Sequence, residues 1–332
     1  MPSSSNEGSG AMIELSVLIP VWRSRPIKLL QALWTEAEAL EFKIELWVCD
    51  DSADPAYFGW HDLFRAHPGI RILTFSENLG RSRARNTLLA KANRRWVLWL
   101  DGDLDIPPGF LKPYQEIVVR NGGEPSEHGP VYCGGIKVEP HSALVGGVIE
   151  GDVRPEDRLR FRYAVQVEGA SAAERQKTPY RWVRAAHCLM PTRAARCLSF
   201  PEFLQGYGHE DTHWAFQIQS KGMKVHHWDH PVEHKGIDTD AIFLDKSRQA
   251  VQNLARLWRY DPLFARYGRD IPLIHAHELM QSTGLMFFFA LGSSWLERRL
   301  LKPKSISLRF FGLMKLIWFD RALRCAQPWE SQ

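Results

Sequence analysis

The sequence lacks the features that build disulfide-bonded, zinc-binding or membrane-spanning proteins. Its five cysteines are odd in number, widely spaced and free of any C-x-x-C pair, which argues against a disulfide framework and against a zinc knuckle. The apolar run at 284–296 is well short of the roughly 20 residues that a membrane-spanning helix needs. We therefore expect a protein of the reducing cytoplasm that does not cross a membrane.

Familiar nucleotide-binding and metalloprotease motifs are missing as well. No G-x-x-x-x-G-K-[ST] and no G-x-G-x-x-G follows the first apolar run, so neither P-loop phosphate capture nor a dinucleotide fingerprint is available. The histidines between 226 and 234 lack an H-E-x-x-H motif or a cysteine pair, which disfavours zinc. No nucleic-acid partner is expected, because no binding motif appears and the basic residues concentrate in an apolar tail.

The composition is that of an ordinary globular chain, with 332 residues of which 45% are hydrophobic and 24% charged. Residues 1–12 are small and polar and predict a disordered leader, not a secretory signal. From Leu296 onward eight basic residues face three acidic ones, a balance that favours attraction to an anionic surface. Residues 306–319 fit a helix in the membrane headgroup region or a helix packed on the body, and both alternatives remain open.

Alternating apolar runs and helical patterns predict β-α-β units and a mostly parallel sheet. Ligands bind beyond the carboxyl ends of the strands in such sheets, and three polar segments follow strands there: Pro20-Val21, Asp50-Asp51 and Asp101-Gly102-Asp103. The predicted strands are 13–19, 44–49, 70–75 and 95–100, and the predicted helices are 26–41, 60–66, 83–92 and 241–260.

Each of these polar segments has a functional and a structural interpretation. Asp101 and Asp103 could bind a divalent cation that shares its ligands with a phosphate, or could simply end a strand in a turn. Asp50 and Asp51 could accept hydrogen bonds from a base or a ribose, or form a turn. Arginines at a helix start, Arg81 and Arg85 among them, could bind an anion or lie on a solvated face.

A second acidic cluster follows glycines at 206–211, in the segment GYGHED. Carboxylates at the start of a helix are favoured by capping and by the helix dipole, so Glu210 and Asp211 have a structural interpretation. A carboxylate there could also act as a general base toward a hydroxyl. Among the histidines that follow, any could join a carboxylate in holding Mn²⁺, or be a packed or surface residue.

Five segments in order, SVLIPVW, WVCDDSAD, ENLGRSRARN, WVLWLDGDLDIPPGFL and GYGHEDTHWAFQI, resemble the inverting family-two glycosyltransferases with a GT-A fold. The last of them also resembles the carboxyl-terminal segment of galactosyltransferase and chondroitin-polymerase-like enzymes. The resemblance covers roughly residues 13–240. It implies a Rossmann-like α/β domain there. Residues 241–332 lie outside the resemblance, and their pattern predicts a helical extension that could contact a membrane.

The resemblance also implies roles for individual residues. Asp103 would ligate Mn²⁺ or Mg²⁺ with His234, His230 being the reserve ligand, and Asp211 would be the base that Glu210 assists. The nucleotide sugar, most simply a UDP-sugar, would contact Pro20, Val21, Asp50, Asp51, Arg81, Arg85, Asp101 and Gly102. The sugar and acceptor pocket would include Trp182, His187, Gly208 and His209. Two positions depart from the family pattern, His187 and the histidine of Gly-His-Glu-Asp.

The sequence thus predicts a metal-dependent glycosyltransferase that acts on a hydroxyl of a glycan or lipid-linked acceptor. It would be cytoplasmic or peripheral at the inner face of the cell membrane, through residues 284–332. One alternative is a membrane-associated nucleotide-sugar-binding scaffold without turnover, which would release no UDP. The other is a metal-dependent hydrolase, which would yield free monosaccharide without an acceptor.

Overall fold

The computed structural model describes residues 13–40, 42–120, 126–138, 158–234, 238–284 and 307–329. Seven strands form one sheet in the order β3-β2-β1-β4-β8-β6-β9. β8 alone runs antiparallel to its neighbours in this sheet, so the prediction of a mostly parallel sheet is confirmed. The strands are β1 (Glu14–Val21), β2 (Lys43–Asp50), β3 (Ile70–Thr74), β4 (Trp96–Leu100), β6 (Val131–Cys133), β8 (His187–Pro191) and β9 (Val225–His227).

A second sheet has three strands in the order β5-β10-β7, and these strands come from distant parts of the sequence. Its strands are β5 (Leu104–Asp105), β7 (Ile136–Val138) and β10 (Val232–His234). β5 and β10 are antiparallel, and their register places His234 opposite Leu104. Because Leu104 follows Asp103 directly, this register brings the predicted metal ligands to the same place.

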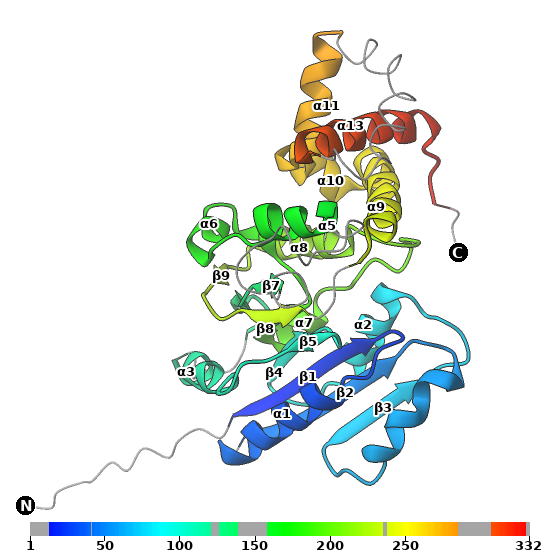
Figure 1. The fold of residues 1–332 in the computed structure, drawn as a ribbon. Coiled ribbons are helices and arrows are strands. Elements are labelled where there is room, and N and C mark those ends of the chain that lie inside the picture. Colours follow the sequence, from blue (N-terminus) through cyan, green and yellow to red (C-terminus); the bar gives the residue numbers. More distant parts are fainter. Residues whose placement is uncertain are drawn as a thin grey trace, which may run out of the picture.

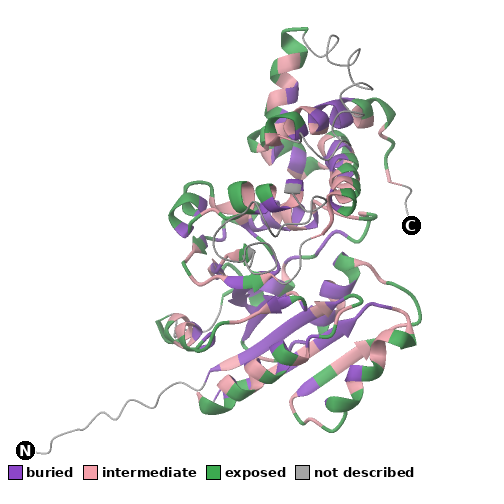
Figure 2. Ribbon diagram, in the orientation of Figure 1, coloured by how far each residue is buried: buried purple, intermediate pink, exposed green. Residues whose placement is uncertain are grey.

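Helices cover both faces of the large sheet, and further helices form a layer above it (Figure 1). α1 (Ile27–Ala39) packs its apolar side on one face, while α2 (Arg81–Lys91), α7 (Thr192–Arg196) and α8 (Glu210–Ser220) pack on the other. β1 lies between these layers and is buried along most of its length (Figure 2). The remaining elements near the sheet are α3 (Lys112–Arg120), α5 (Arg158–Tyr163), a π-helical turn (Ala164–Glu168), α6 (Ala172–Lys177) and a 3₁₀ turn (Pro179–Trp182).

The helix predicted at 60–66 is instead a 3₁₀ helix at Pro55–Leu63. It begins earlier because the Asp54 side chain accepts a hydrogen bond from the Ala56 amide and Pro55 occupies the first helical position. The other predicted helices are confirmed with small shifts at their ends. The helix predicted at 241–260 is α9 (Asp240–Tyr260), which Thr239 caps through the Ile242 amide.

The C-terminal helices share one apolar core with parts of the sheet-bearing half. Phe311 and Ile317 of α13 (Leu308–Cys325) pack in this core with Leu254 of α9 and Phe216 of α8. This burial favours the packed alternative for the helix predicted at 306–319, whereas residues 285–306 lie outside the described part. Within the described residues no helix is long and apolar enough to cross a membrane. The remaining elements are α10 (Pro262–Tyr267), a 3₁₀ turn (Gly268–Asp270) and α11 (Pro272–Ser282).

Candidate active site

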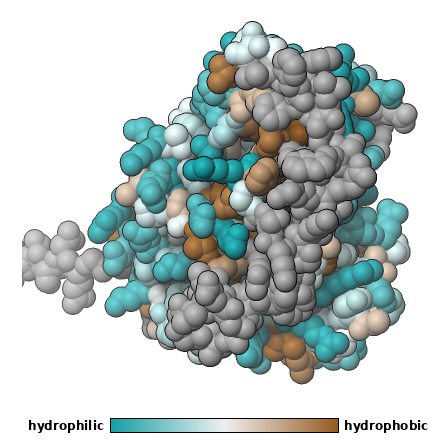
Figure 3. Space-filling model, turned by 45° about the horizontal axis from the view of Figure 1, so that its top comes forward, coloured by the Kyte–Doolittle hydropathy of each residue, from teal (hydrophilic) through white to brown (hydrophobic). Residues whose placement is uncertain are grey.

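A cavity of about 900 Å³ lies where the carboxyl end of β4, the start of α8 and the C-terminal helices meet. Both polar and apolar side chains line it. Figure 3 shows hydrophilic and hydrophobic residues next to one another on one face of the molecule. Of the residues predicted from the sequence, the lining includes Arg81, Arg85, Asp101, Asp103, Trp182, His187, Gly208, His209, Glu210, Asp211 and His234. Pro20, Val21, Asp50, Asp51, Gly102 and His230 do not belong to it.

Asp101, Gly102 and Asp103 leave β4 beside the end of β1. The Gly102 amide donates to the Pro20 carbonyl at 3.2 Å. A Cβ atom at position 102 would lie 2.7 Å from Cγ2 of Val21, so only glycine lets the two chain segments approach this closely. Pro20, Val21 and Gly102 therefore fix the position of the two carboxylates on either side of Gly102.

Asp103 and His234 form the predicted pair, with 3.2 Å between Oδ2 and Nε2. Both side chains are partly exposed, at 46% and 35%. Burial opposes ionisation of Asp103, but the hydrogen bond and charge of His234 outweigh it and lower the pKa of that carboxyl. A carboxylate oxygen beside an imidazole is a donor set that Mn²⁺ accepts, and substrate phosphates complete such sites. Among the described residues no group of three or more His, Cys, Asp or Glu side chains could hold a metal.

Asp50 and Asp51 use their carboxylates inside the protein. Asp50 accepts from the Ser52 amide at 3.1 Å and lies 2.9 Å from Nε2 of His61. Asp51 accepts from the Gly80 amide and from Nδ2 of Asn78, both at 2.9 Å. The Asp51 bonds anchor the loop that leads into α2 and so position the arginines of that helix. The Asp50 bonds instead hold the turn after β2 and the 3₁₀ helix Pro55–Leu63.

Arg81 and Arg85 extend from the first turns of α2 toward two different carboxylates. Arg85 is only 3% exposed, and its Nη2 donates to Oδ1 of Asp101 at 2.8 Å. Its Nε and Nη1 atoms are buried without a hydrogen-bond partner among the described residues. Arg81 lies over the Tyr207 ring, 4.5 Å from its centroid, and 3.5 Å from Oε1 of Glu210. The two arginines thus connect the acids after β4 with those of α8.

The segment before α8 has a strained backbone. Gly206, Gly208 and His209 all have positive φ angles, of 73°, 101° and 71°. A Cβ atom on Gly208 would lie 2.5 Å from Cβ of Ala250 on α9. His209, an ordinary L-residue in the left-handed region, pays a conformational cost there, which its Nδ1 contact with Oγ1 of Thr212 at 3.2 Å partly offsets. This tight turn sets the direction in which the acids of α8 point.

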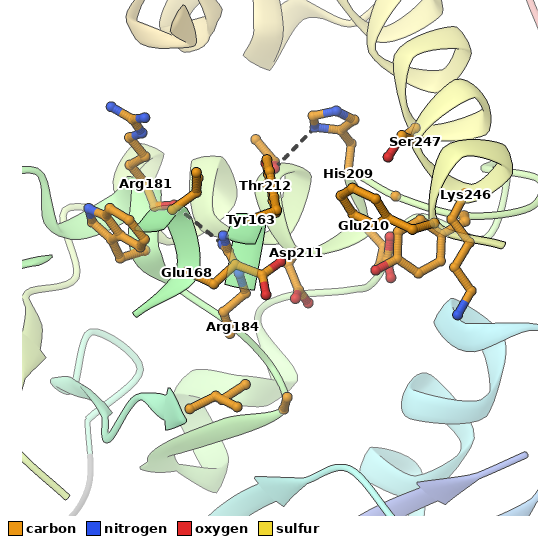
Figure 4. Close-up of a pocket in the computed structure, with 18 of the residues that line it drawn as sticks. Tyr163, Glu168, Arg181, Arg184, His209, Glu210, Asp211, Thr212, Lys246 and Ser247 are labelled. Atoms are coloured by element: carbon orange, nitrogen blue, oxygen red, sulfur yellow. Dashed lines mark hydrogen bonds between the residues drawn. The ribbon is translucent and has the colours of Figure 1, made fainter. Parts of the chain in front are cut away.

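The carboxylates of Glu210 and Asp211 project into the cavity from the first turn of α8 (Figure 4). Burial raises the pKa of Asp211 to about 6, with Arg85 opposing and Glu210 adding to the shift. Burial acts in the same direction on Glu210, but the charges of Arg81 and Arg85 outweigh it and lower its pKa. Oδ1 of Asp211 is buried and has no hydrogen-bond partner among the described residues. The two acids therefore differ. Glu210 is ionised at physiological pH, whereas Asp211 has a pKa of about 6.

His187 belongs to the cavity wall, but both of its ring nitrogens bond within the protein. Nδ1 lies 2.9 Å from the Gly135 carbonyl, and Nε2 bonds the Tyr114 hydroxyl. Burial lowers the pKa of His187 to about 3, so the ring is neutral at physiological pH. His230 is likewise used internally, since its Nε2 lies 2.9 Å from the Phe110 carbonyl. Trp182 lines the cavity at the end of its 3₁₀ turn.

Sequence reasoning missed several polar residues of the lining. Arg181 and Arg184 lie within two residues of the predicted Trp182. Their closeness in sequence could have predicted that they belong to the same pocket. Tyr207 stands inside the predicted GYGHED segment. Lys315 lies in the helix predicted at 306–319, where its position in the sequence gives no sign of a cavity. No sequence signal places Arg160, Glu168 or Lys246 at this cavity, because the packing of distant helices brings them there.

Comparisons with known sequences found similarity to glycosyltransferases. A model of the family "Glycosyl transferase family 2" matches residues 16–123. A curated protein of Mycobacterium tuberculosis (strain CDC 1551 / Oshkosh), provisionally named as a glycosyltransferase, is 29% identical over 117 residues, which are 34% of this chain and 34% of its own length. The chain thus spans about a third of the length of the curated relative it matches.

Solved structures extend the similarity over the rest of the chain. The mannosyltransferase PcManGT from Pyrobaculum calidifontis, in complex with GDP-Man and Mn²⁺, aligns with a TM-score of 0.52 and 16% identity, covering 95% of this chain and 87% of that one. Residues 1–349 of S. aureus TarS align with a TM-score of 0.45 and 15% identity, covering 94% and 90%. Residues 16–123 therefore match the glycosyl transferase family 2 model, and the chain has a fold similar to that of GT-A glycosyltransferase structures.

Proposed function

We propose that the protein is a metal-dependent, inverting glycosyltransferase. It transfers a sugar from a nucleotide sugar, a UDP-sugar by its sequence resemblance, to a hydroxyl of a glycan or lipid-linked acceptor. The observation that carries this proposal is that Asp103, His234 and Asp211 line one cavity. A cation-binding pair and a separate base, facing a common space, are what a displacement at a sugar carbon requires.

Asp103 and His234 would hold Mn²⁺ or Mg²⁺ on the donor side of the cavity. When bound, the cation would act as a Lewis acid toward the leaving diphosphate. Arg85 and Arg81 add positive charge on the same side, and Arg85 has donors left after its bond to Asp101. A guanidinium with free donors favours phosphate oxygens. GDP-Man and Mn²⁺ in the mannosyltransferase of similar fold support a donor of this class.

Asp211 is the proposed general base. The acceptor O–H would give its proton to the Asp211 carboxylate while the acceptor oxygen attacks the anomeric carbon and the nucleoside diphosphate leaves. A pKa of about 6 suits this role, because the group is ionised at neutral pH and is still basic enough to take a proton. One displacement from the face opposite the leaving group inverts the anomeric centre, without a covalent intermediate. Glu210, held by Arg81, would orient the substrates.

The substitution Asp211→Asn tests this proposal. It keeps the size of the side chain and removes the base, so turnover should fall by about 10²- to 10⁴-fold. Binding of the nucleoside diphosphate with Mn²⁺ should not change, as calorimetry would show. Asp62→Asn, at an exposed position of the 3₁₀ helix Pro55–Leu63, is the matched control. Unchanged turnover in the Asp211 variant, or a product that retains the anomeric configuration, would contradict the proposal.

A further inference from the structure

Three cationic side chains of the cavity wall form no ion pair with a carboxylate among the described residues, although the charge of Arg184 does lower the pKa of Asp211. They are Arg181, Arg184 and Lys315. Among the described residues, Arg184 donates only to the carbonyls of Val183 and Arg181, at 3.1 Å and 3.4 Å. Arg181 lies over the ring of Trp182, 5.7 Å from its centroid. Lys315 lies 4.7 Å and 5.0 Å from the ring centroids of Phe311 and Tyr163.

The other cations of the lining are already engaged within the protein. Arg175 is enclosed by carbonyl oxygens, with the Ala170 carbonyl 2.6 Å from its Nη1. The remaining four form ion pairs: Arg81 with Glu210, Arg85 with Asp101, Arg160 with Glu168 and Lys246 with Asp238. Among the described lining residues, the solvent-accessible cations without an ion pair are therefore Arg181, Arg184 and Lys315, which we call the cationic wall.

Two members of the cationic wall, Arg184 and Lys315, lie on the Asp211 side of the cavity. Arg184 stands beside Asp211, whereas Arg181 points away from it, toward the helices above (Figure 4). Lys315 approaches from α13, and its charge and that of Arg184 both act on His209, directly before the acids of α8. Asp103 and His234, which hold the donor side, come from the loop after β4 and from β10.

A divalent cation at Asp103 and His234 would offset much of the charge of a nucleoside diphosphate. Arg81 and Arg85, although each pairs with a carboxylate, lie on the same side and would offset the rest. The cationic wall is not needed for that purpose. We propose, on the basis of the function proposed above, that the acceptor is an anion. A phosphate or carboxylate group of the acceptor binds Arg184, with Lys315 and Arg181 adding to the field, and its neighbouring hydroxyl faces Asp211.

The chemistry of the wall suits such a group. A guanidinium binds carboxylate and phosphate with two parallel hydrogen bonds, and an exposed arginine that donates only to backbone carbonyls can turn toward a ligand. Apolar residues from the C-terminal helices, Phe311, Leu308 and Leu273 among them, also belong to the lining. The anionic group could therefore belong to a soluble sugar acid or sugar phosphate, or to a lipid phosphate.

The test measures the binding of matched probes by calorimetry, with the protein saturated with Mn²⁺ and whichever of UDP or GDP it binds. The soluble pairs are glucuronate with glucose, and glucose 6-phosphate with glucose; the lipid pair is farnesyl phosphate with farnesol. We expect the charged member of at least one pair to bind about tenfold more tightly than its neutral partner. The pair that shows the difference identifies the soluble or the lipid source.

The double variant Arg184→Gln with Lys315→Gln should abolish this difference while leaving the affinity for the nucleotide with Mn²⁺ within about twofold. Lys177→Gln, an exposed charge on α6 outside the cavity lining, is the control. Equal binding of charged and neutral probes would overturn the proposal, as would binding of none of them. A charged probe that displaces the nucleotide, or a double variant that loses nucleotide affinity, would assign the wall to the donor and overturn it too. If neither UDP nor GDP binds with Mn²⁺, the proposed function itself fails.

Discussion

Nε2 of His234 lies 3.2 Å from Oδ2 of Asp103, although one residue follows β4 and the other ends β10. The antiparallel pairing of β5 with β10 produces this contact, because it sets His234 opposite Leu104, the residue after Asp103. The small sheet therefore has a role beyond packing: it assembles the proposed cation site from two distant segments.

Removing either member of this pair should weaken cation-dependent donor binding. We expect Asp103→Ala and His234→Ala each to reduce the affinity for a nucleoside diphosphate in the presence of Mn²⁺ by about tenfold or more, since a site with two protein ligands loses one of them. Calorimetric titrations with and without Mn²⁺ measure the effect. His128→Ala, on an exposed turn, is the control. Equal affinity of the unmodified protein with and without Mn²⁺ would refute the cation site.

The pH dependence of turnover follows from the raised pKa of Asp211. The carboxylate is the active form of a base, so activity should be full well above pH 6, half-maximal at about pH 6, and should fall further at lower pH. Well below that value, kcat/KM should decrease by about tenfold per pH unit, because one proton inactivates the base. Initial rates between pH 4.5 and 8 would show this limb, at roughly two pH units above an ordinary aspartate. A midpoint near pH 4 would mean that burial does not act on Asp211 as described.

Arg85 should affect both the stability of the protein and the pH dependence of its activity. Its charge lowers the pKa of Asp211, so in Arg85→Met the midpoint of the activity profile should move upward. The same substitution leaves Asp101 without its partner. Breaking a buried ion pair costs 3–5 kcal/mol, but Asp101 is partly exposed, so a loss of about 2 kcal/mol is expected in urea denaturation. Arg65→Met, which removes an exposed pair with Asp62, should change neither quantity. An unchanged midpoint in Arg85→Met would show that the charge of Arg85 does not act on Asp211.

The first half of the fold was predictable because its signals are local. β1, β2 and β4 are apolar runs that end at Pro20-Val21, Asp50 and Asp101, and parallel pairing then places those ends at one edge. The acids of α8 were found in the same way, from glycines before paired carboxylates. These features depend on neighbours in sequence, which a single chain displays directly.

The rest depends on contacts between distant segments. Nothing local to Asp51 shows that its carboxylate binds the loop at 78–80, a bond across 29 positions to Gly80. The same holds for His187, whose partners Tyr114 and Gly135 belong to other elements. The C-terminal helices show apolar periodicity, which predicts burial but not the surface that they cover, so their share of the cavity was not foreseen.

His209, the histidine of Gly-His-Glu-Asp, stands in a left-handed conformation that glycine would adopt more easily. Glycine adopts a φ of 71° freely, whereas an L-residue pays about 1–2 kcal/mol. We therefore expect His209→Gly to leave thermal stability unchanged or slightly higher, because the relief of strain offsets the lost contact with Thr212. His209→Ala should be less stable than the unmodified protein by about 1 kcal/mol, since it keeps the strain and loses the contact. Gly208→Ala should be the least stable of the three, because its new Cβ would meet Ala250 at 2.5 Å as well as carrying a φ of 101°. Denaturation curves of the three variants give the order directly, and an alanine at 209 that is as stable as glycine there would contradict the strained turn.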